Sequence, residues 1–455
     1  MASVGNDVEA FGNAGSSDVL SRIYGALKKT YKREQIDANF ELHCPFVKSL
    51  KKRKVAPGQD YTWAVSLDPA NGIGNNLADV IAGVGVSDSV ARGTGMANFT
   101  AKMSKDYSVL NLDNEFIARA ASPDAAFAAQ FRYQVNGSLQ WFGTQYARKI
   151  AGNGSGALAK IAYTDINTPS GTLYYTLPHK SMTRFFTKNT VLVVCDLSTT
   201  GVPTGNLAAG GTVTAVDRNT GIITVSGAPV LTAYSGSTSG LLLGARGVMG
   251  VVGSPIRTDN VCGVAGWIPT TVPTSLATVG LGTTRINSTY NRDLYPERLA
   301  GHRLTGSTAP IDDLLFELGG RMMEVGSIPD VCGMSFNTYA KIASRQWNKV
   351  MPYDAKMAAA INCKPLSIVT PAGQLPFMVD ASFPDDAVYL LKRNTWEIIH
   401  TSSGVPAQIT EGAGNGNAFQ LDEDGVQYRW RAWSQLVCVD PYQNGVAAVS
   451  DSSFI

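Results

Sequence analysis

Histidines and carboxylates are the side chains of this sequence that could act as general acids and bases or bind a metal. The histidines are few and far apart, and none lies in an H-x-x-H or H-E-x-x-H pattern. Asp312-Asp313 is expected at a helix start, where carboxylates favour the helix dipole. Asp385-Asp386 follows Pro384, which predicts a turn. The four histidines are His43, His179, His302 and His400.

One acidic run resembles part of a calcium-binding loop. Asp422, Glu423 and Asp424 precede Gly425. The run lacks the alternating acidic order before the glycine and the later glutamate that completes such a loop. It therefore predicts no metal site.

Glycine-rich segments could form a nucleophile elbow or a phosphate-binding loop. Residues 152–156 and 236–240 are rich in Gly and Ser, but neither has the G-x-S-x-G spacing. Several G-x-G pairs occur without completing G-x-G-x-x-G between a strand and a helix. Lys180-Ser181 has no glycine loop before it. We therefore expect no enzyme, and no catalytic, cofactor-binding or metal-binding residue.

Two groups of basic residues could contact nucleic acid. The run Lys48-Ser49-Leu50-Lys51-Lys52-Arg53-Lys54 is either a nucleic-acid patch or a solvated segment beside acidic neighbours. Arg429 and Arg431 alternate with Trp430, and the aromatic rings could stack on nucleotides or sugars. A half-buried strand explains this alternation more simply, with the arginines facing solvent or a neighbouring subunit.

The composition is that of a folded protein with little surface charge. Of 455 residues, 44% are hydrophobic and 16% charged, against about 25% charged in a typical protein. Such a surface suits a protein that is mostly covered by neighbours. The net charge of +2 excludes a strongly basic, histone-like DNA binder. Six cysteines without CxxC spacing, and no apolar leader or membrane-length run, predict buried thiols in a protein folded in a cytoplasm.

A long helix is the clearest element of the sequence. Ser122 is a good N-cap and Pro123 suits the first helical position. Gly152-Asn153-Gly154 predicts the C-terminal end. A helix over 122–150 would be roughly 40 Å long, which is more than a compact domain usually needs. Its apolar stripe comprises Phe127, Phe131, Val135, Leu139, Phe142, Tyr146 and Ile150.

Two extended segments precede this helix. Residues 60–67 alternate, with Tyr61, Trp63, Val65 and Leu67 on one face. A second extended run begins near Phe99, after the polar, glycine-studded segment 68–95. So long a connection is unusual within a compact core, and it predicts an excursion that packs against another subunit.

The remaining elements follow a β-rich region. A hairpin is expected from 212–216 and 222–225, and a further strand over 190–195, in a small inserted barrel or sandwich. Helices are expected over 17–37, 310–325, with Ser307 and Thr308 as cap candidates, and 337–350. The final strands are expected at 377–380, 388–392, 396–400, 426–432 and 436–439.

This order of elements resembles that of tailed-bacteriophage major capsid proteins of the Hong Kong ninety-seven type, over nearly the whole chain. Two stretches are also similar to phage coat proteins locally: Asn260-Val261-Cys262-Gly263-Val264-Ala265-Gly266-Trp267-Ile268-Pro269 and Ile328-Pro329-Asp330-Val331-Cys332-Gly333-Met334-Ser335. The resemblance implies an α+β capsid fold with an N-terminal arm, an extended two-stranded loop, a long spine helix, and peripheral and axial domains. The expected divisions are 1–56 arm with helix, 57–105 extended loop, 106–160 peripheral domain with spine helix 122–151, 161–260 inserted β domain, 261–380 axial domain, and 381–455 axial and peripheral strands.

The resemblance also implies a function. A virion structural protein of this kind, made late in infection, self-assembles as pentamers and hexamers into an icosahedral shell around double-stranded DNA, which it contacts weakly and non-specifically. A separate scaffolding protein, a portal and decoration proteins are the other expected partners, with no membrane. Assembly takes place in the host bacterial cytoplasm. The expected subunit contacts are Tyr61, Trp63, Phe99, Met103, Lys102, Lys105, Arg429 and Arg431.

A second function is compatible with the same sequence. The β-rich region between residues 165 and 260 could be the binding part of a carbohydrate-binding or tail-associated virion protein. The two functions predict different particles, because a glycan-binding protein would be a soluble monomer and a capsid protein a hollow assembly.

Overall fold

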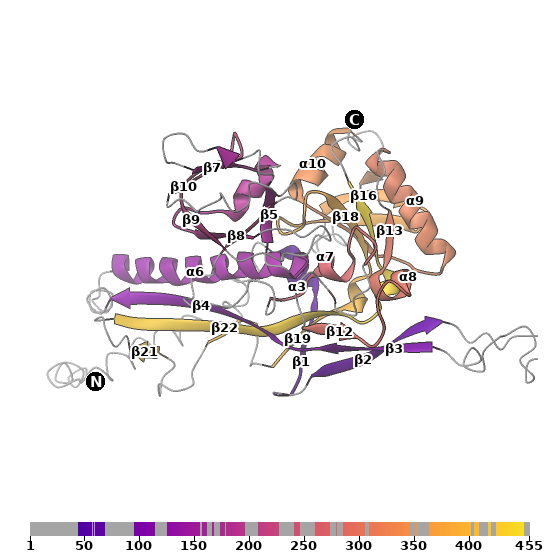
Figure 1. Cartoon of the computed structure of the whole chain (residues 1–455), viewed down its shortest axis with the longest axis horizontal. Coiled ribbons are helices and arrows are strands. Elements are labelled where there is room, and N and C mark those ends of the chain that lie inside the picture. The colour runs from indigo at the N-terminus through magenta and orange to yellow at the C-terminus, as the bar shows by residue number, and fades with distance from the viewer. Residues whose placement is uncertain are drawn as a thin grey trace, which may run out of the picture. The chain divides into compact units, whose positions relative to one another are not determined.

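The computed structural model has the α+β architecture that the sequence predicts (Figure 1). The chain divides into two compact units, one made of residues 1–43, 106–144 and 403–432, and the other of 44–105, 145–402 and 433–455. Both units therefore combine stretches that are distant in sequence. The structure describes residues 44–56, 58, 60–68, 95–113, 125–154, 157–161, 166–167, 173–177, 179–195, 208–226, 241–245, 260–273, 279, 285–304, 309–345, 351–352, 364–401, 405–408, 417–419 and 425–449.

Several predictions lie outside these described residues. They include the arm helix over 17–37, the segment 69–94, the caps Ser122, Ser307 and Thr308, and the acidic residues 422–424. The long helix is confirmed as α6 (Ala125–Ala151). In its described part the stripe Val135, Leu139, Phe142, Tyr146 and Ile150 is buried, as predicted. The helix ends where Gly152 N–H donates to the Arg148 carbonyl at 2.8 Å.

The first unit also contains parts of two long strands. β4 (Ser104–Asp113) pairs with β22 (Gly425–Cys438). The short strands β20 (Ala407–Gln408) and β21 (Asn417–Phe419) pair antiparallel with β22 as well. The sequence predicts two extended segments near 426–439, and the structure joins them into this one strand. Ser108 and Ser138 place their hydroxyls 3.5 Å apart, so β4 contacts α6 within this unit.

In the second unit, the predicted extended segments form a hairpin. β2 (Tyr61–Asp68) and β3 (Gly95–Ala101) pair antiparallel from Tyr61 opposite Ala101 to Asp68 opposite Gly95. β12 (Ile286–Ser288) adds a third strand beside β3. Separately, β1 (Lys51–Lys54), which follows the short helix α3 (Pro45–Ser49), pairs parallel with β19 (Trp396–His400).

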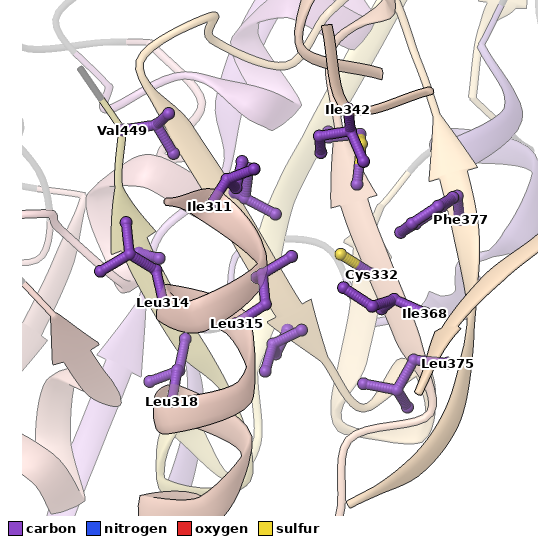
Figure 2. Close-up of a cluster of buried hydrophobic side chains, with 14 of the residues drawn as sticks. Ile311, Leu314, Leu315, Leu318, Cys332, Ile342, Ile368, Leu375, Phe377 and Val449 are labelled. Carbon is purple, nitrogen blue, oxygen red and sulfur yellow. The ribbon is translucent and has the colours of Figure 1, made fainter. Parts of the chain in front are cut away.

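A hydrophobic core lies under the predicted helix near 310. α9 (Ile311–Glu324) packs on β13 (His302–Leu304), β16 (Lys364–Thr370) and β23 (Gly445–Ala448). Asp312 and Asp313 occupy its first turn, as predicted. Figure 2 shows Ile311, Leu314, Leu315 and Leu318 on the inner side of α9, with Ile368, Leu375 and Phe377 across from them in the same cluster.

These strands belong to one seven-stranded sheet with the order β13-β23-β18-β14-β17-β16-β15. Its other members are β14 (Val331–Met334), β15 (Met351–Pro352), β17 (Gly373–Val379) and β18 (Ala387–Leu391). α10 (Phe336–Arg345) follows β14 and buries Ile342 in the same core. We refer to this sheet with α9 and α10 as the axial region. Its strands come from both of the expected divisions 261–380 and 381–455.

The inserted β region is also one seven-stranded sheet, ordered β5-β11-β8-β9-β10-β7-β6. The predicted hairpin is confirmed as β9 (Ala208–Asp217) and β10 (Ile222–Ser226), and the predicted strand at 190–195 as β8 (Val191–Cys195). The expected barrel or sandwich is not confirmed: the pairings of the described residues give a single sheet that ends at β5 and β6. Serial hairpins produce the same alternation whether a sheet closes or stays open. The other strands are β5 (Ala157–Ile161), β6 (Ile166–Asn167), β7 (Leu173–Thr176) and β11 (Leu241–Ala245).

The inserted sheet is joined to the axial region through the short 3-10 helix η5 (Lys180–Phe185). Arg184 of η5 donates from Nε to the Ala381 carbonyl at 2.8 Å and from Nη2 to the Phe383 carbonyl at 3.2 Å. The Phe185 ring lies between two guanidinium groups, 3.9 Å from that of Arg148 and 4.3 Å from that of Arg184. These contacts hold η5 between the end of α6 and the loop that follows β17.

Candidate assembly surfaces

The β2–β3 hairpin has one buried face, which is anchored by aromatic rings of its own chain. The rings of Trp63 and Phe99 stack with their centroids 5.5 Å apart. Trp267, from the short helix α7 (Val264–Trp267), packs against both at 5.9 and 5.2 Å. Its indole N–H donates to the Leu436 carbonyl at 3.1 Å. Ring contacts of this kind add to the free energy of burial, so the base of the hairpin is fixed to the body of the second unit.

Gly263 and Arg292 hold the short helix α7, which carries Trp267, in place. Gly263 lies against the Lys149 and Ile150 carbonyls at the end of α6, where any Cβ would clash with the backbone. The buried Arg292 donates to the Gly266 and Leu299 carbonyls at 3.1 and 3.2 Å, and to that of Trp267. Burial lowers the pKa of Arg292 to about 10. A positive charge at these carbonyls favours the C-terminal ends of the helices that carry them.

The opposite face of the hairpin is exposed and uncharged. Thr62 stands opposite Thr100 with their hydroxyls 3.4 Å apart, and Ala64 stands opposite Asn98. Asn287 of β12 continues the row beside Thr100. From Thr62 to Ser66 of β2, and at the positions of β3 and β12 beside them, none of the described side chains on this face is charged. We call this the hairpin outer face: Thr62, Ala64, Ser66, Met96, Asn98, Thr100 and Asn287.

The structure corrects the predicted contact roles of Trp63 and Phe99. Phe99 is 0% exposed and Trp63 is 9% exposed, so these side chains stabilise their own chain and cannot form a substantial contact with a neighbour. The alternation at 60–67 marks the face that packs on Trp267, and the next residues along each strand point outward. Sequence reasoning therefore identified the correct strands and the wrong face.

The other predicted contact residues near the hairpin remain accessible. Tyr61 is half-buried and accepts a hydrogen bond from Arg53 at 2.9 Å. Lys102 is exposed and lies 4.0 Å from the Asp60 carboxylate. Lys105 places its ammonium 5.6 Å from the centroid of the Trp433 ring. Met103 is half-buried. Tyr61 lies on the Trp63 side of the hairpin, with 5.4 Å between the ring centroids. The contact role of these four side chains stays a prediction.

The predicted arginines of β22 lie in the first unit. Arg429 is exposed and donates to the Gln427 side-chain oxygen at 3.1 and 2.7 Å. Arg431 is half-buried, whereas Trp430 between them is buried. This confirms the expected alternation of a half-buried strand. It also makes the Trp430 ring unavailable as a stacking surface for nucleotides or sugars.

Two exposed apolar surfaces were missed by sequence reasoning. On the axial region, Phe316 is 57% exposed, and Met323, Val325 and Ile328 follow it on and after α9. In the first unit, Tyr133 is 79% exposed on α6, and Trp141 is partly exposed eight residues on. Apolar residues outside the buried stripe of each helix were the available signal, since solvent-facing helix positions are usually polar.

Several groups that could do chemistry are buried in the described part of the chain. No group of three or more His, Cys, Asp or Glu side chains among them is placed to hold a metal. Cys44, Cys262, Cys332 and Cys438 are buried, as expected. Burial raises the pKa of the Cys262 thiol to about 12, which opposes formation of a reactive thiolate. His302 is buried beside Tyr442, at 4.9 Å between ring centroids. In the described part of the chain, every helix is too short or too polar to cross a membrane.

No protein-family model matches this chain, and no curated protein sequence does. Solved structures do show similarity at low identity. The Cyanophage A-1(L) capsid asymmetric unit matches over 89% of this chain and 92% of that chain, with 10% identity and a TM-score of 0.49. The capsid of a native GTA particle matches over 90% of each chain, with 9% identity and a TM-score of 0.38. The holo-SrpI encapsulin complex from Synechococcus elongatus PCC 7942 matches over 100% and 98%, with 8% identity and a TM-score of 0.38.

Proposed function

We propose that this chain is a major capsid protein that assembles with copies of itself, as pentamers and hexamers, into an icosahedral shell around double-stranded DNA. The observation that carries the proposal is the β2–β3 hairpin. One of its faces is fixed by Trp63, Phe99 and Trp267. The hairpin outer face is solvent-exposed and uncharged. The hairpin is therefore anchored on one face and presents an uncharged face that a neighbouring subunit can cover.

The chemistry of the hairpin outer face supports this role. The cores of protein interfaces are depleted in charged residues, because burying a charge costs more than burying a small polar group. Thr62, Ala64 and Ser66 have short side chains, and ordering them on association costs little entropy. A strip of this kind can be covered without leaving buried charges unpaired.

The order of elements supports the same proposal. The hairpin, the long helix α6, the inserted sheet, most of the axial region and the long strand β22 follow one another along the chain, and β23 of the axial region comes after β22. This is the order that the family resemblance implies. Each contact between subunits can be weak, since a closed symmetric shell repeats it many times. The exposed apolar residues after Phe316 supply a second surface for contacts within such an assembly.

The remaining parts of the proposal concern partners and location. A separate scaffolding protein, a portal and decoration proteins would act with this subunit in the host bacterial cytoplasm, and the finished shell would be part of the virion. The role is structural rather than enzymatic. The buried thiols and the buried His302, which packs on Tyr442, support this assignment.

Electron microscopy of the purified full-length chain tests the function. Negative-stain images and sedimentation are expected to show hollow particles of megadalton size. A soluble monomer at all concentrations would contradict the proposal and favour the carbohydrate-binding alternative, which a glycan array would then examine.

A deletion tests the part played by the loop. Asp68 and Gly95 pair across the hairpin, so residues 69–94 can be replaced by a two-residue Asn-Gly turn without separating the strands. The shortened chain is expected to fold and to form no stable shells. Normal particles from the shortened chain would show that residues 69–94 are not needed for assembly.

A further inference from the structure

The basic run at residues 48–54 forms a distinct charged surface on the second unit. Lys51 to Lys54 are β1, which pairs on one side with β19 and ends the strand order of its sheet. Lys48 precedes it in the last turn of α3. Leu50 is buried and fixes the segment to the core. We call Lys48, Lys51, Lys52, Arg53 and Lys54 the basic edge strand.

The buried side chain of Glu397 forms ion pairs with two residues of the basic edge strand. Lys51 Nζ lies 3.1 Å from Glu397 Oε1, and Arg53 Nη1 lies 3.4 Å from Glu397 Oε2. The Glu397 side chain is 8% exposed, while those of Lys51 and Arg53 are 73% and 52% exposed. Two cations thus share one buried carboxylate and still present their outer surfaces to solvent.

Lys48 and Lys54 extend this surface without neutralisation. Both side chains are exposed, and neither has an ion-pair partner among the residues that the structure describes. Opposite Lys54, the paired residue of β19 is His400, which is not an acidic side chain. The basic edge strand therefore carries a local excess of positive charge in a chain whose net charge is only +2.

We propose that the basic edge strand binds the phosphate backbone of double-stranded DNA without sequence preference. A strand advances about 3.3 Å per residue, and duplex DNA carries one charge per roughly 1.7 Å of axis. Side chains alternate along a strand, so Lys51 and Arg53 leave one face of β1 and Lys52 and Lys54 the other, with about 6.6 Å between the two positions on a face. Each face can therefore contact two phosphates.

The same surface fits an acidic protein less well. Protein interfaces have apolar or aromatic anchors at their centre, and between residues 48 and 54 the one apolar side chain, Leu50, is buried. The Arg53 guanidinium is already held by Tyr61, 2.9 Å from its hydroxyl. The cations are arranged for contact with a uniform polyanion rather than for reading base edges.

The inference rests on the proposed function only for the source of the DNA, because binding to a duplex can be measured with any sequence. Dispersed full-length subunits, separated from particles by sizing chromatography, are titrated onto a short fluorescent duplex at about 50 to 200 mM salt. The test variant is Lys48→Gln with Lys54→Gln, which leaves the pairs with Glu397 intact. Each lost phosphate contact lowers the slope of log affinity against log salt by about 0.9.

The double variant is expected to lose about 1.8 from that slope, which corresponds to roughly sixtyfold weaker binding at about 0.1 M salt. The control is Lys180→Gln with Lys188→Gln, an equal change of charge at exposed lysines beside the inserted sheet. The control is expected to keep the wild-type slope. Two duplexes of unrelated sequence should bind wild-type protein equally.

Three results would overturn the inference. They are an unchanged slope for the Lys48 and Lys54 variant, an equal loss in the control, and displacement of the duplex by polyglutamate at equal charge concentration. Particle formation by the same variants is scored separately by microscopy. Normal shells with an unchanged DNA slope would refute this inference alone, and DNA binding by a wild-type chain that forms no shells would refute the proposed function alone.

Discussion

Nη1 of Arg184 lies 3.3 Å from Oδ2 of Asp385, and the Asp385 side chain is only 1% exposed. The same carboxylate accepts hydrogen bonds from the Ser181 hydroxyl at 2.5 Å and from the Ser335 hydroxyl. Ser181 and Arg184 belong to η5, whereas Ser335 immediately precedes α10. One buried charge therefore joins the inserted sheet to the axial region.

Replacing Asp385 with Asn is expected to lower the free energy of unfolding by about 2 kcal/mol. The change leaves the Arg184 charge without its partner, which costs 3–5 kcal/mol for a fully buried pair, or about 2 for an arginine that keeps some contact with water. Urea unfolding followed by circular dichroism measures the loss. The control Glu317→Gln breaks the exposed pair with Arg321 and should cost less than about 0.5 kcal/mol. Equal losses of unfolding free energy in the two variants would show that the buried Asp385–Arg184 pair stabilises the fold no more than an exposed pair does.

Truncating Phe99 to Ala is expected to destabilise the second unit by about 3–5 kcal/mol, since it leaves a cavity between Trp63 and Trp267. Met96→Ala, on the exposed face of the same strand, should change stability by no more than about 0.5 kcal/mol. Thermal melting compares the two variants. A Phe99→Ala protein as stable as the wild type would mean that the hairpin is not anchored by these rings.

Placing a charge on the hairpin outer face is expected to block assembly without unfolding the subunit. Ala64→Glu puts a carboxylate where a neighbour would cover it, and a buried unpaired charge is costly. Ala215→Glu on β9 makes the same substitution at another exposed strand position. Both variants should melt like the wild type, and only Ala64→Glu should fail to form particles in negative stain. Shells from Ala64→Glu would exclude this face as an interface.

His302 is expected to make stability fall in mildly acidic solution. Burial, more than any nearby charge, holds the pKa of His302 below its ordinary value of 6.5. Between the folded and unfolded pKa values the unfolded chain binds more protons, so stability decreases as the pH falls from about 6.5 towards the folded pKa. Melting temperatures measured across this range should decline more steeply for the wild type than for His302→Gln. Parallel curves of melting temperature against pH for the two proteins would show that His302 is not the cause of the decline.

Local patterns in the sequence were sufficient to find most of the described elements. The 3.6-residue stripe from Val135 to Ile150 predicted α6 and its buried face, because a helix places those positions on one side whatever packs there. Alternation likewise predicted β2, β3, β9 and β10. The cap of α9 could not be placed in this way, since the residue at the N-cap position is Pro310, whose side chain cannot accept a hydrogen bond from the first turn.

The candidate site was less accessible to the same reasoning. Alternation divides a strand into two faces and does not say which one the body of the protein covers. Trp63 and Phe99 were therefore assigned to a neighbour, while Trp267, some 168 residues beyond Phe99 in the sequence, covers them within the same chain. The surface that carries the proposed function consists instead of short side chains such as Ala64 and Asn98, which have no distinctive pattern.

By itself, the sequence determined the elements and their order, the low surface charge and the basic run at 48–54, because these depend only on neighbouring residues. Tertiary structure decided which distant segments meet. It placed β1 beside β19 with Glu397 under Lys51 and Arg53, and it brought Asp385 to Arg184. Such pairings follow from how complementary surfaces pack after the chain has folded back on itself, and no local periodicity records them.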